Sequence, residues 1–150
     1  MILVLILLLP IAAAGVAWAI PWNRWRPLVL PTASVAQLAL VVQAVRGGPV
    51  STAGGWLVLD PLVIPVLLTV SVLFLCLALY APAYLHIRHN RPNRVFCVCL
   101  LFVLGMMSLV LFAHHLGLMW VAIEATTLAS GPLLYFNQTP RSLEAAWKYL

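Results

Sequence analysis

The sequence predicts an all-α integral membrane protein, a helical bundle with five transmembrane helices and the start of a sixth. Of its 150 residues, 65% are hydrophobic and 7% are charged, whereas a soluble domain carries about 25% charged residues. The mean hydropathy is +1.10. The apolar residues fall into runs of the length that a bilayer core about 30 Å thick requires, roughly 20 helical residues. This composition excludes a water-soluble domain.

Five spans are expected, separated by short polar gaps: residues 2–20, 28–45, 59–85, 95–113 and 116–136. The second span is the most polar, because it contains Ser34, Gln37 and Gln43. We therefore expect this helix to face protein rather than lipid. After the fifth span, the string "LEAAWKYL" has helical periodicity and predicts the first turns of a sixth helix.

The basic residues predict the orientation in the membrane. The net charge is +5, but the positive charges lie between apolar runs, so they indicate membrane orientation and not nucleic-acid binding. The gaps after the first, third and fifth spans hold seven of the eight basic residues: Arg24, Arg26, Arg88, Arg91, Arg94, Arg141 and Lys148. Arg46 alone lies on the other side. Because cytoplasmic loops retain positive charge, the N-terminus is expected outside and the "PRSLEAAWKYL" tail inside.

The main candidate for a functional residue is Glu124, in the middle of the fifth span within "WVAIEATTLAS". An ionised carboxylate at the bilayer centre costs roughly 2.5–3.5 kcal/mol, and intramembrane acids usually carry protons or ions. Thr127 lies on the same helical face and is a possible accessory residue. Pro132 cannot donate to the carbonyl of Leu128, which leaves an acceptor for water. A proton or ion relay is favoured; the alternative is a structural tie to a basic side chain of a neighbouring helix.

Two further charges leave alternatives open. Asp60 stands before a proline at the outer mouth of the third span, where capping of the helix is favoured over a direct part in ion uptake. Lys148 opens the incomplete sixth helix. It either reaches the cytoplasmic surface along its aliphatic chain or pairs with an acid inside a bundle.

Metal binding, cofactor binding and catalysis by side chains are not expected. The three cysteines, Cys76, Cys97 and Cys99, lie inside apolar runs, which favours free thiols over disulfides. Cys97 and Cys99 lie inside a span while the nearby histidines lie in the 86–94 gap, an arrangement that disfavours a zinc site. No Ser-His-Asp, Cys-His or paired-carboxylate arrangement can be assembled from the sequence.

Three strings carry a family resemblance: "LDPLVIPVLLTVSVLFLCLALYAPAYL", "LGMMSLVLFAHHLGLMWVAIEATTLASGPLLYF" and "TPRSLEAAWKYL". The chain resembles the antiporter-like proton-pumping membrane subunits of complex I, Mrp-type antiporters and group 4 hydrogenases, with the hydrogenase-4 component F type most similar. The resemblance implies a bundle of about fourteen helices built from two inverted repeats with broken helices. Residues 1–150 then correspond to the N-terminal third, an N-terminal fragment of the antiporter-like transmembrane domain.

The resemblance also implies a proton relay. In the family pattern a glutamate on the fifth helix pairs with a lysine on the seventh. Glu124 matches that glutamate within its motif, and Lys148 matches the basic residue that opens the sixth helix. The seventh helix lies beyond this chain, and Pro132 departs from the plain hydrophobic residue of the pattern.

The implied function is proton or cation translocation coupled to an oxidoreductase complex of the hydrogenase-4, formate hydrogenlyase or NADH dehydrogenase type. The chain would be a non-catalytic membrane subunit without a cofactor of its own, incomplete by itself. Its partners would be other membrane subunits, a peripheral hydrogenase or dehydrogenase arm and the lipid bilayer, with no nucleic acid. The expected location is the inner membrane of a bacterium or archaeon. The alternatives are an Mrp-type cation/proton antiporter subunit and a small membrane scaffold that transports nothing.

Overall fold

The computed structural model describes residues 1–22, 25–52, 54–87 and 93–149, and 82% of this part of the chain is helical. Its six α-helices are α1 (Ile2–Ala19), α2 (Val29–Arg46), α3 (Val63–Ile87), α4 (Arg94–Phe112), α5 (Leu116–Leu134) and α6 (Pro140–Tyr149). Short 3₁₀ helices cover Arg26–Leu28 and Tyr135–Asn137. The first five helices are long and apolar enough to cross a membrane. The predicted all-α membrane bundle is confirmed.

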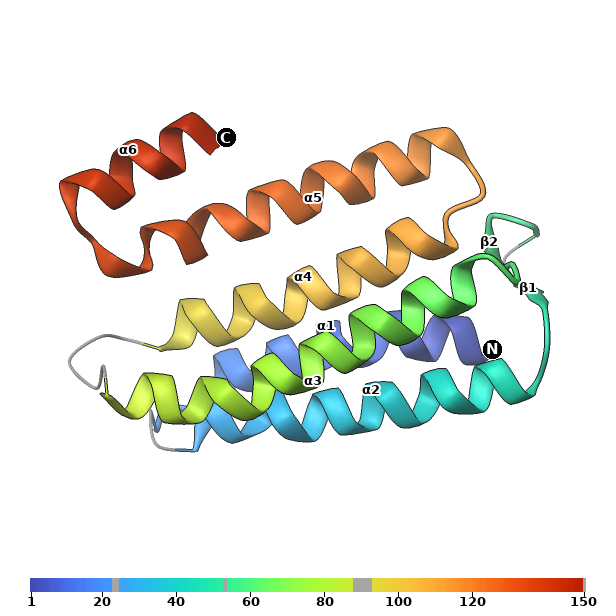
Figure 1. Ribbon diagram of the computed structural model, residues 1–150, viewed down its shortest axis with the longest axis horizontal. Helices are drawn as coiled ribbons and strands as arrows, with labels where there is room; N and C mark the ends of the chain where they lie inside the picture. The colour runs from blue at the N-terminus through green and yellow to red at the C-terminus, as the bar shows by residue number, and fades with distance from the viewer. Residues whose placement is uncertain (23–24, 53, 88–92, 150) are drawn as a thin grey trace.

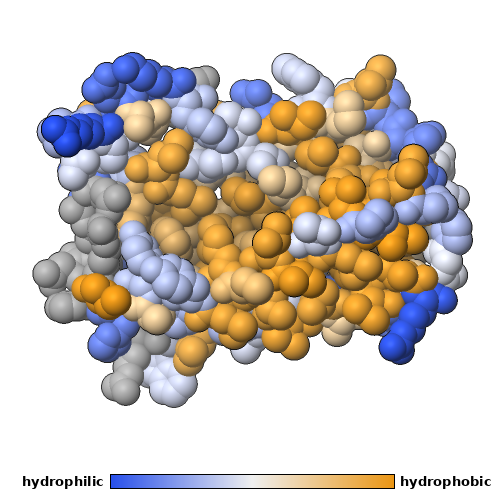
Figure 2. All heavy atoms as spheres, in the orientation of Figure 1, coloured by the Kyte–Doolittle hydropathy of each residue, from blue (hydrophilic) through white to orange (hydrophobic). Residues whose placement is uncertain are grey.

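The five long helices run side by side, each antiparallel to the one before it in the chain (Figure 1). α4 packs between α1 and α5, α1 also packs on α2, and α2 packs on α3. α6 turns back along α5 (Figure 1). α5 is therefore an edge helix, covered on one side by α4 and partly by α6. Figure 2 shows that hydrophobic side chains dominate the middle of the visible face, while the most hydrophilic ones gather towards its two ends.

The predicted start of the third span is wrong. The helix begins at Val63, and Leu59 lies in a strand, β2 (Leu57–Leu59), that pairs with β1 (Val50–Thr52) in an antiparallel hairpin. The turn between the strands uses Gly54 and Gly55, whose φ angles of 67° and 91° favour glycine. Paired strands satisfy the backbone of these residues, so the apolar Leu57 and Leu59 are buried without extending the helix.

The buried core consists of two apolar clusters along the bundle. One lies near the end where α1 stops and α4 starts, and includes Ala17, Leu30, Ala81 and Leu101. The other lies near the hairpin and includes Leu3, Ile6, Val41, Ala44, Leu57, Leu67 and Phe112. We call these two ends of the molecule the basic end and the hairpin end.

The polar residues of α2 follow the prediction in part. Ser34 and Gln37 are buried, each about 1% exposed. Gln43 is exposed, so it packs on none of the described helices, and its contact with protein stays a prediction. Gln43 lies six residues after Gln37, about 600° of helical rotation, and so faces a different direction.

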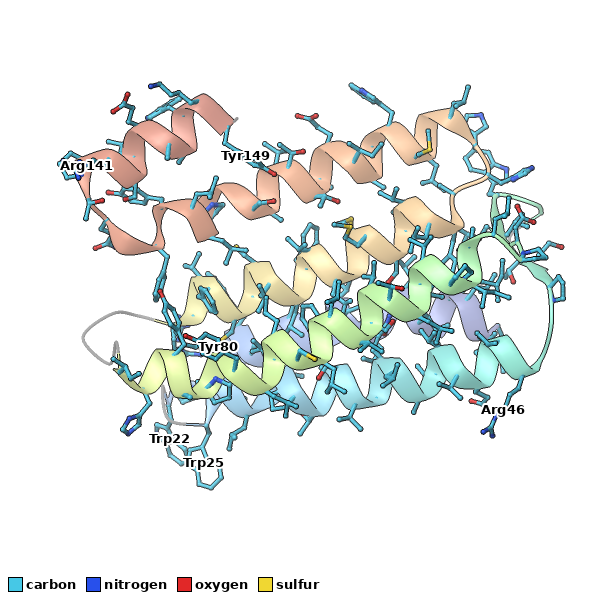
Figure 3. All side chains as sticks on the ribbon, in the orientation of Figure 1. Trp22, Trp25, Arg46, Tyr80, Arg141 and Tyr149 are labelled. Atoms are coloured by element: carbon cyan, nitrogen blue, oxygen red, sulfur yellow. The ribbon has the colours of Figure 1, made fainter. Side chains whose placement is uncertain are left out.

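The described arginines lie at the ends of the bundle that the topology prediction gives them. Arg26 and Arg94 lie at the basic end, where α1 stops and α4 starts. Arg141 lies at the same end and Arg46 at the hairpin end (Figure 3). Arg24, Arg88 and Arg91 lie outside the described residues. Which end faces the cytoplasm stays a prediction.

Candidate functional site

Glu124 lies on the outward-facing side of α5. Of this helix only Ala122 and Gly131 are buried, and both residues are small enough to allow close packing. Glu124 is exposed, and its neighbours one turn away on the same face, Trp120 and Leu128, are 67% and 58% exposed. The carboxylate therefore faces away from α4. The exposed helix face around it, with Trp120 and Leu128, is apolar.

The hydroxyl groups near Glu124 donate to their own helix. Thr127 Oγ1 donates to the carbonyl of Ile123 at 3.1 Å, and Thr126 Oγ1 donates to the carbonyl of Ala122 at 2.8 Å. A hydroxyl has one hydrogen and two lone pairs. The Thr127 hydroxyl donates its hydrogen to Ile123, so towards Glu124 it has only a lone pair to offer. It could therefore accept a hydrogen bond from Glu124 only if that carboxyl were protonated.

Lys148 is paired with a different acid. Its Nζ lies 2.6 Å from Oε1 of Glu144, one turn earlier in α6, with the two side chains 75% and 64% exposed. This is the one ion pair among the described residues, so the structure does not pair Lys148 with Glu124.

The position of α6 beside α5 determines how far Lys148 lies from Glu124 along the bundle. Tyr149 Oη lies 3.5 Å from Ser130 Oγ of α5. Ser130 follows Glu124 by six residues, about 9 Å along the helix axis. The end of α6 therefore lies beside α5 near the level of Ser130, about 9 Å along the helix axis from Glu124.

The start of α6 is built by a reciprocal cap. The backbone N–H of Ser142 donates to Thr139 Oγ1 at 3.1 Å, and that of Thr139 donates to Ser142 Oγ at 2.8 Å. Pro140, the first helical residue, needs no donor there. The local sequence "TPRS" thus turns the chain back along α5.

Asp60 lies at the hairpin end, in the turn that leads into α3. Its side chain is exposed, and its backbone carbonyl accepts a hydrogen bond from Val63 N at 3.0 Å. Among the described residues, the side chain of Asp60 forms no ion pair with Lys148 and lies at the opposite end of α3 from the basic end. A capping role for its carboxylate stays a prediction.

Sequence reasoning missed a buried arginine. Arg26 is 2% exposed. Its Nε donates to the carbonyl of Ala17 at 3.0 Å, its Nη1 donates to Asn93 Oδ1 at 2.6 Å, and its Nη2 donates to the carbonyl of Ile20. The sequence indicated only a loop charge, because the acceptors come from the end of α1 and from a residue 67 positions later.

A second buried polar contact joins α2 and α4. Gln37 Nε2 donates to Ser108 Oγ at 3.3 Å, and Ser108 Oγ donates to the carbonyl of Leu104 at 2.9 Å. The polar composition of the second span predicted that Gln37 faces protein, and this is confirmed. The partner on α4 was not predicted.

Histidines and cysteines form no cluster of three or more possible metal ligands among the described residues. His115 caps α5, since its Nδ1 accepts from Gly117 N at 3.2 Å, and its ring stacks on Trp56 with centroids 4.8 Å apart. Cys76, Cys97 and Cys99 are free thiols; Cys97 is buried and Cys99 half-buried, whereas Cys76 is exposed.

Comparison with known proteins finds partial similarity. No family model matches the chain. It is 46% identical over 43 residues to a hydrogenase-4 component F homolog of Methylacidiphilum infernorum. It is 48% identical over 42 residues to NADH-ubiquinone oxidoreductase chain 2 of Ornithorhynchus anatinus. These matches cover 29% and 28% of this chain and 9% and 12% of the relatives. The chain is thus a multi-pass membrane protein similar, over part of its length, to membrane subunits of hydrogenase and complex I-like assemblies.

Proposed function

We propose that the chain is part of a membrane subunit that translocates protons, or another cation, in a complex I-like or hydrogenase-type assembly. The observation that carries the proposal is the exposed carboxylate of Glu124 within an apolar helix face. A charged group there is costly in lipid. It persists at lower cost when further helices cover it and supply a hydrogen-bond or ionic partner.

In this proposal, residues 1–150 form the N-terminal part of an antiporter-like transmembrane domain, and the outer face of α5 packs against further helices of the assembly. Glu124 takes up and releases the transported proton. Thr127 accepts a hydrogen bond from the protonated carboxyl, which fits the direction of its own bond to Ile123.

Lys148 acts in the same relay as a mobile positive charge. Its pair with Glu144 is exposed and worth at most about 1 kcal/mol. Glu144 is therefore only a weak, exposed partner of Lys148, and the proposed relay does not depend on it. Asp60 lies at the hairpin end, where it would attract cations towards the bundle if the hairpin end faces outside.

The proposed partners are other membrane subunits and a peripheral hydrogenase or dehydrogenase arm that carries the redox centres. The two similar proteins, a hydrogenase component and an NADH-ubiquinone oxidoreductase chain, support this class of partner. The proposed location is the inner membrane of a bacterium or archaeon, and the chain itself performs no redox chemistry.

The test is Glu124→Gln, introduced into the native gene, with the matched variant Glu144→Gln as the control. Inverted membrane vesicles are energised with the redox substrate of the complex, and acidification is followed with a quenching dye. Glu124→Gln is expected to abolish dye quenching while the complex still assembles on a native gel. Glu144→Gln should retain quenching, because it removes only an exposed pair.

A scaffold predicts a different result. If Glu124 only ties helices together, the amide introduced by Glu124→Gln preserves a hydrogen bond, and both assembly and proton movement survive. Normal quenching by Glu124→Gln vesicles at wild-type complex content would refute the relay.

A further inference from the structure

Gln37 lies in the core of the bundle, away from the Glu124 face, and its surroundings are independent of the proposed function. Gln37 is 1% exposed and its side-chain nitrogen donates to Ser108 Oγ, which is fully buried. Its side-chain oxygen, Oε1, is buried and receives no hydrogen bond from any described residue. In a membrane protein such an acceptor has no lipid group to bond with.

The other buried hydroxyls of the bundle cannot donate to it, because each already donates to its own helix. Ser108 donates to the carbonyl of Leu104 at 2.9 Å, Ser34 to that of Pro31 at 2.9 Å, and Ser71 to that of Leu67 at 2.8 Å. Exchanging the oxygen and nitrogen of the Gln37 amide does not help. The amide nitrogen would then be the buried atom without a partner, and Ser108 would have to give up Leu104.

The site lies between the two apolar clusters of the core. On α2, Gln37 is flanked by Ala33 of the basic-end cluster and Val41 of the hairpin-end cluster. Ser108 on α4 likewise lies between Leu101 and Phe112 of the same two clusters. The polar pair therefore interrupts the apolar core at one level instead of lying at a wet end of the bundle.

We propose that this level holds an internal water molecule, bound between α2 and α4, that donates a hydrogen bond to Gln37 Oε1. Ser108 Oγ accepts one bond and donates one, so its second lone pair can accept the other hydrogen of the same water. Buried waters in proteins characteristically satisfy such groups.

A water fits the chemistry better than a metal cation. The buried polar side chains of the described chain are Arg26, Ser34, Gln37, Ser71, Asn93 and Ser108, and none is a carboxylate. Na⁺ or a divalent cation needs several oxygen ligands and, in a low-dielectric core, negative charge. A neutral donor is sufficient for one orphan amide oxygen.

The test uses the full chain in lipid nanodiscs, labelled with ¹³C at the side-chain carbonyl of glutamine. The chain has three glutamines, Gln37, Gln43 and Gln138. Their infrared bands are assigned by subtraction with Gln43→Leu and Gln138→Leu, so that no variant at the buried position is needed. The Gln37 carbonyl is expected at the lower frequency of a hydrogen-bonded amide.

The donor is then identified in ¹⁵N-glutamine-labelled protein. A long-lived magnetisation transfer between water and the Gln37 side-chain amide protons is expected, with exchange much slower than for the exposed Gln43. A free-carbonyl frequency for Gln37 would refute the proposal. A bonded carbonyl with transfer only from protein protons would refute it as well, because the donor would then be another side chain.

Discussion

Arg26 Nη1 donates to Oδ1 of Asn93 at 2.6 Å, a bond that joins residues 67 positions apart. The same guanidinium also bonds to the carbonyls of Ala17 and Ile20 at the end of α1. Next to it, the guanidinium of Arg94 lies over the Trp18 ring, 5.4 Å from its centroid. The end of α1, the start of α2 and the start of α4 are thereby fixed together at the basic end.

We predict that Arg26→Met destabilises the bundle by roughly 3 kcal/mol. The substitution keeps the length of the side chain but leaves buried acceptors without donors, each costing about 1–3 kcal/mol. Thermal unfolding in one detergent, followed by circular dichroism, measures the loss. Arg46→Met is the control, since Arg46 is exposed at the hairpin end, and it should change stability by about 0.5 kcal/mol or less. Equal effects of the two variants would contradict the role of Arg26.

Gly105 sets the distance between α1 and α4. A Cβ atom at this position would lie 3.2 Å from Ile11 Cγ1 and 3.4 Å from Pro10 Cγ. Gly105→Leu is therefore expected to destabilise the chain by about 1–3 kcal/mol through overpacking. Gly15→Leu is a matched control within α1, because a Cβ there meets no atom within 4 Å. The Gly15→Leu control should be neutral or slightly stabilising, since glycine is unfavourable inside helices. An equal loss of stability in both variants would show that the effect of Gly105→Leu does not come from the close approach of α1 and α4.

The cap of α6 is predicted to hold this helix against α5. Thr139→Ala removes the hydroxyl that accepts from Ser142 N and should cost about 1 kcal/mol. Amide hydrogen exchange within α6 should become several-fold faster, while α1 to α4 exchange as in the wild type. Thr32→Ala is the control, because the Thr32 hydroxyl bonds only to carbonyls of its preceding turn, those of Leu28 and Val29. Unchanged exchange in α6 would show that packing, and not the cap, positions the helix.

The topology prediction places the basic end inside. Reporter fusions after Arg46 and after Arg141 should report opposite sides of the membrane, with the Arg141 fusion cytoplasmic. These residues lie at opposite ends of the bundle (Figure 3). A cytoplasmic reporter after Arg46 would reverse the orientation and show that the charge asymmetry is overridden.

Hydropathy predicted the number of spans and most of their ends to within a residue or two, because the length of an apolar run is a local property. The prediction failed at residues 59–62. There the apolar Leu57 and Leu59 are buried in a hairpin whose pairing with Val50–Thr52 depends on a turn through Gly54 and Gly55. An apolar run alone does not distinguish a buried strand from the start of a helix.

For the candidate site, the sequence identified Glu124 from the cost of a charge in lipid. It did not identify the ion-pair partner of Lys148. Lys148 was expected to snorkel or to pair inside a bundle. It pairs with Glu144, an exposed acid one turn away that was not considered, and its role in a larger bundle stays a prediction. The burial of Arg26 was likewise not predicted, because its acceptors come from the end of α1 and from Asn93, far away in the sequence.

The sequence by itself determined that the chain is a membrane bundle, which residues span it and where a carboxylate lies within a span. Composition and periodicity are sufficient for this, since the bilayer imposes both the length and the polarity of each helix. Only the tertiary structure decided that α5 lies at an edge with Glu124 facing outwards, that Arg26 is buried, and that Gln37 bonds to Ser108 of α4. Those directions depend on which helices pack together, and close packing is allowed by small residues such as Gly105 on α4 and Ala122 and Gly131 on α5.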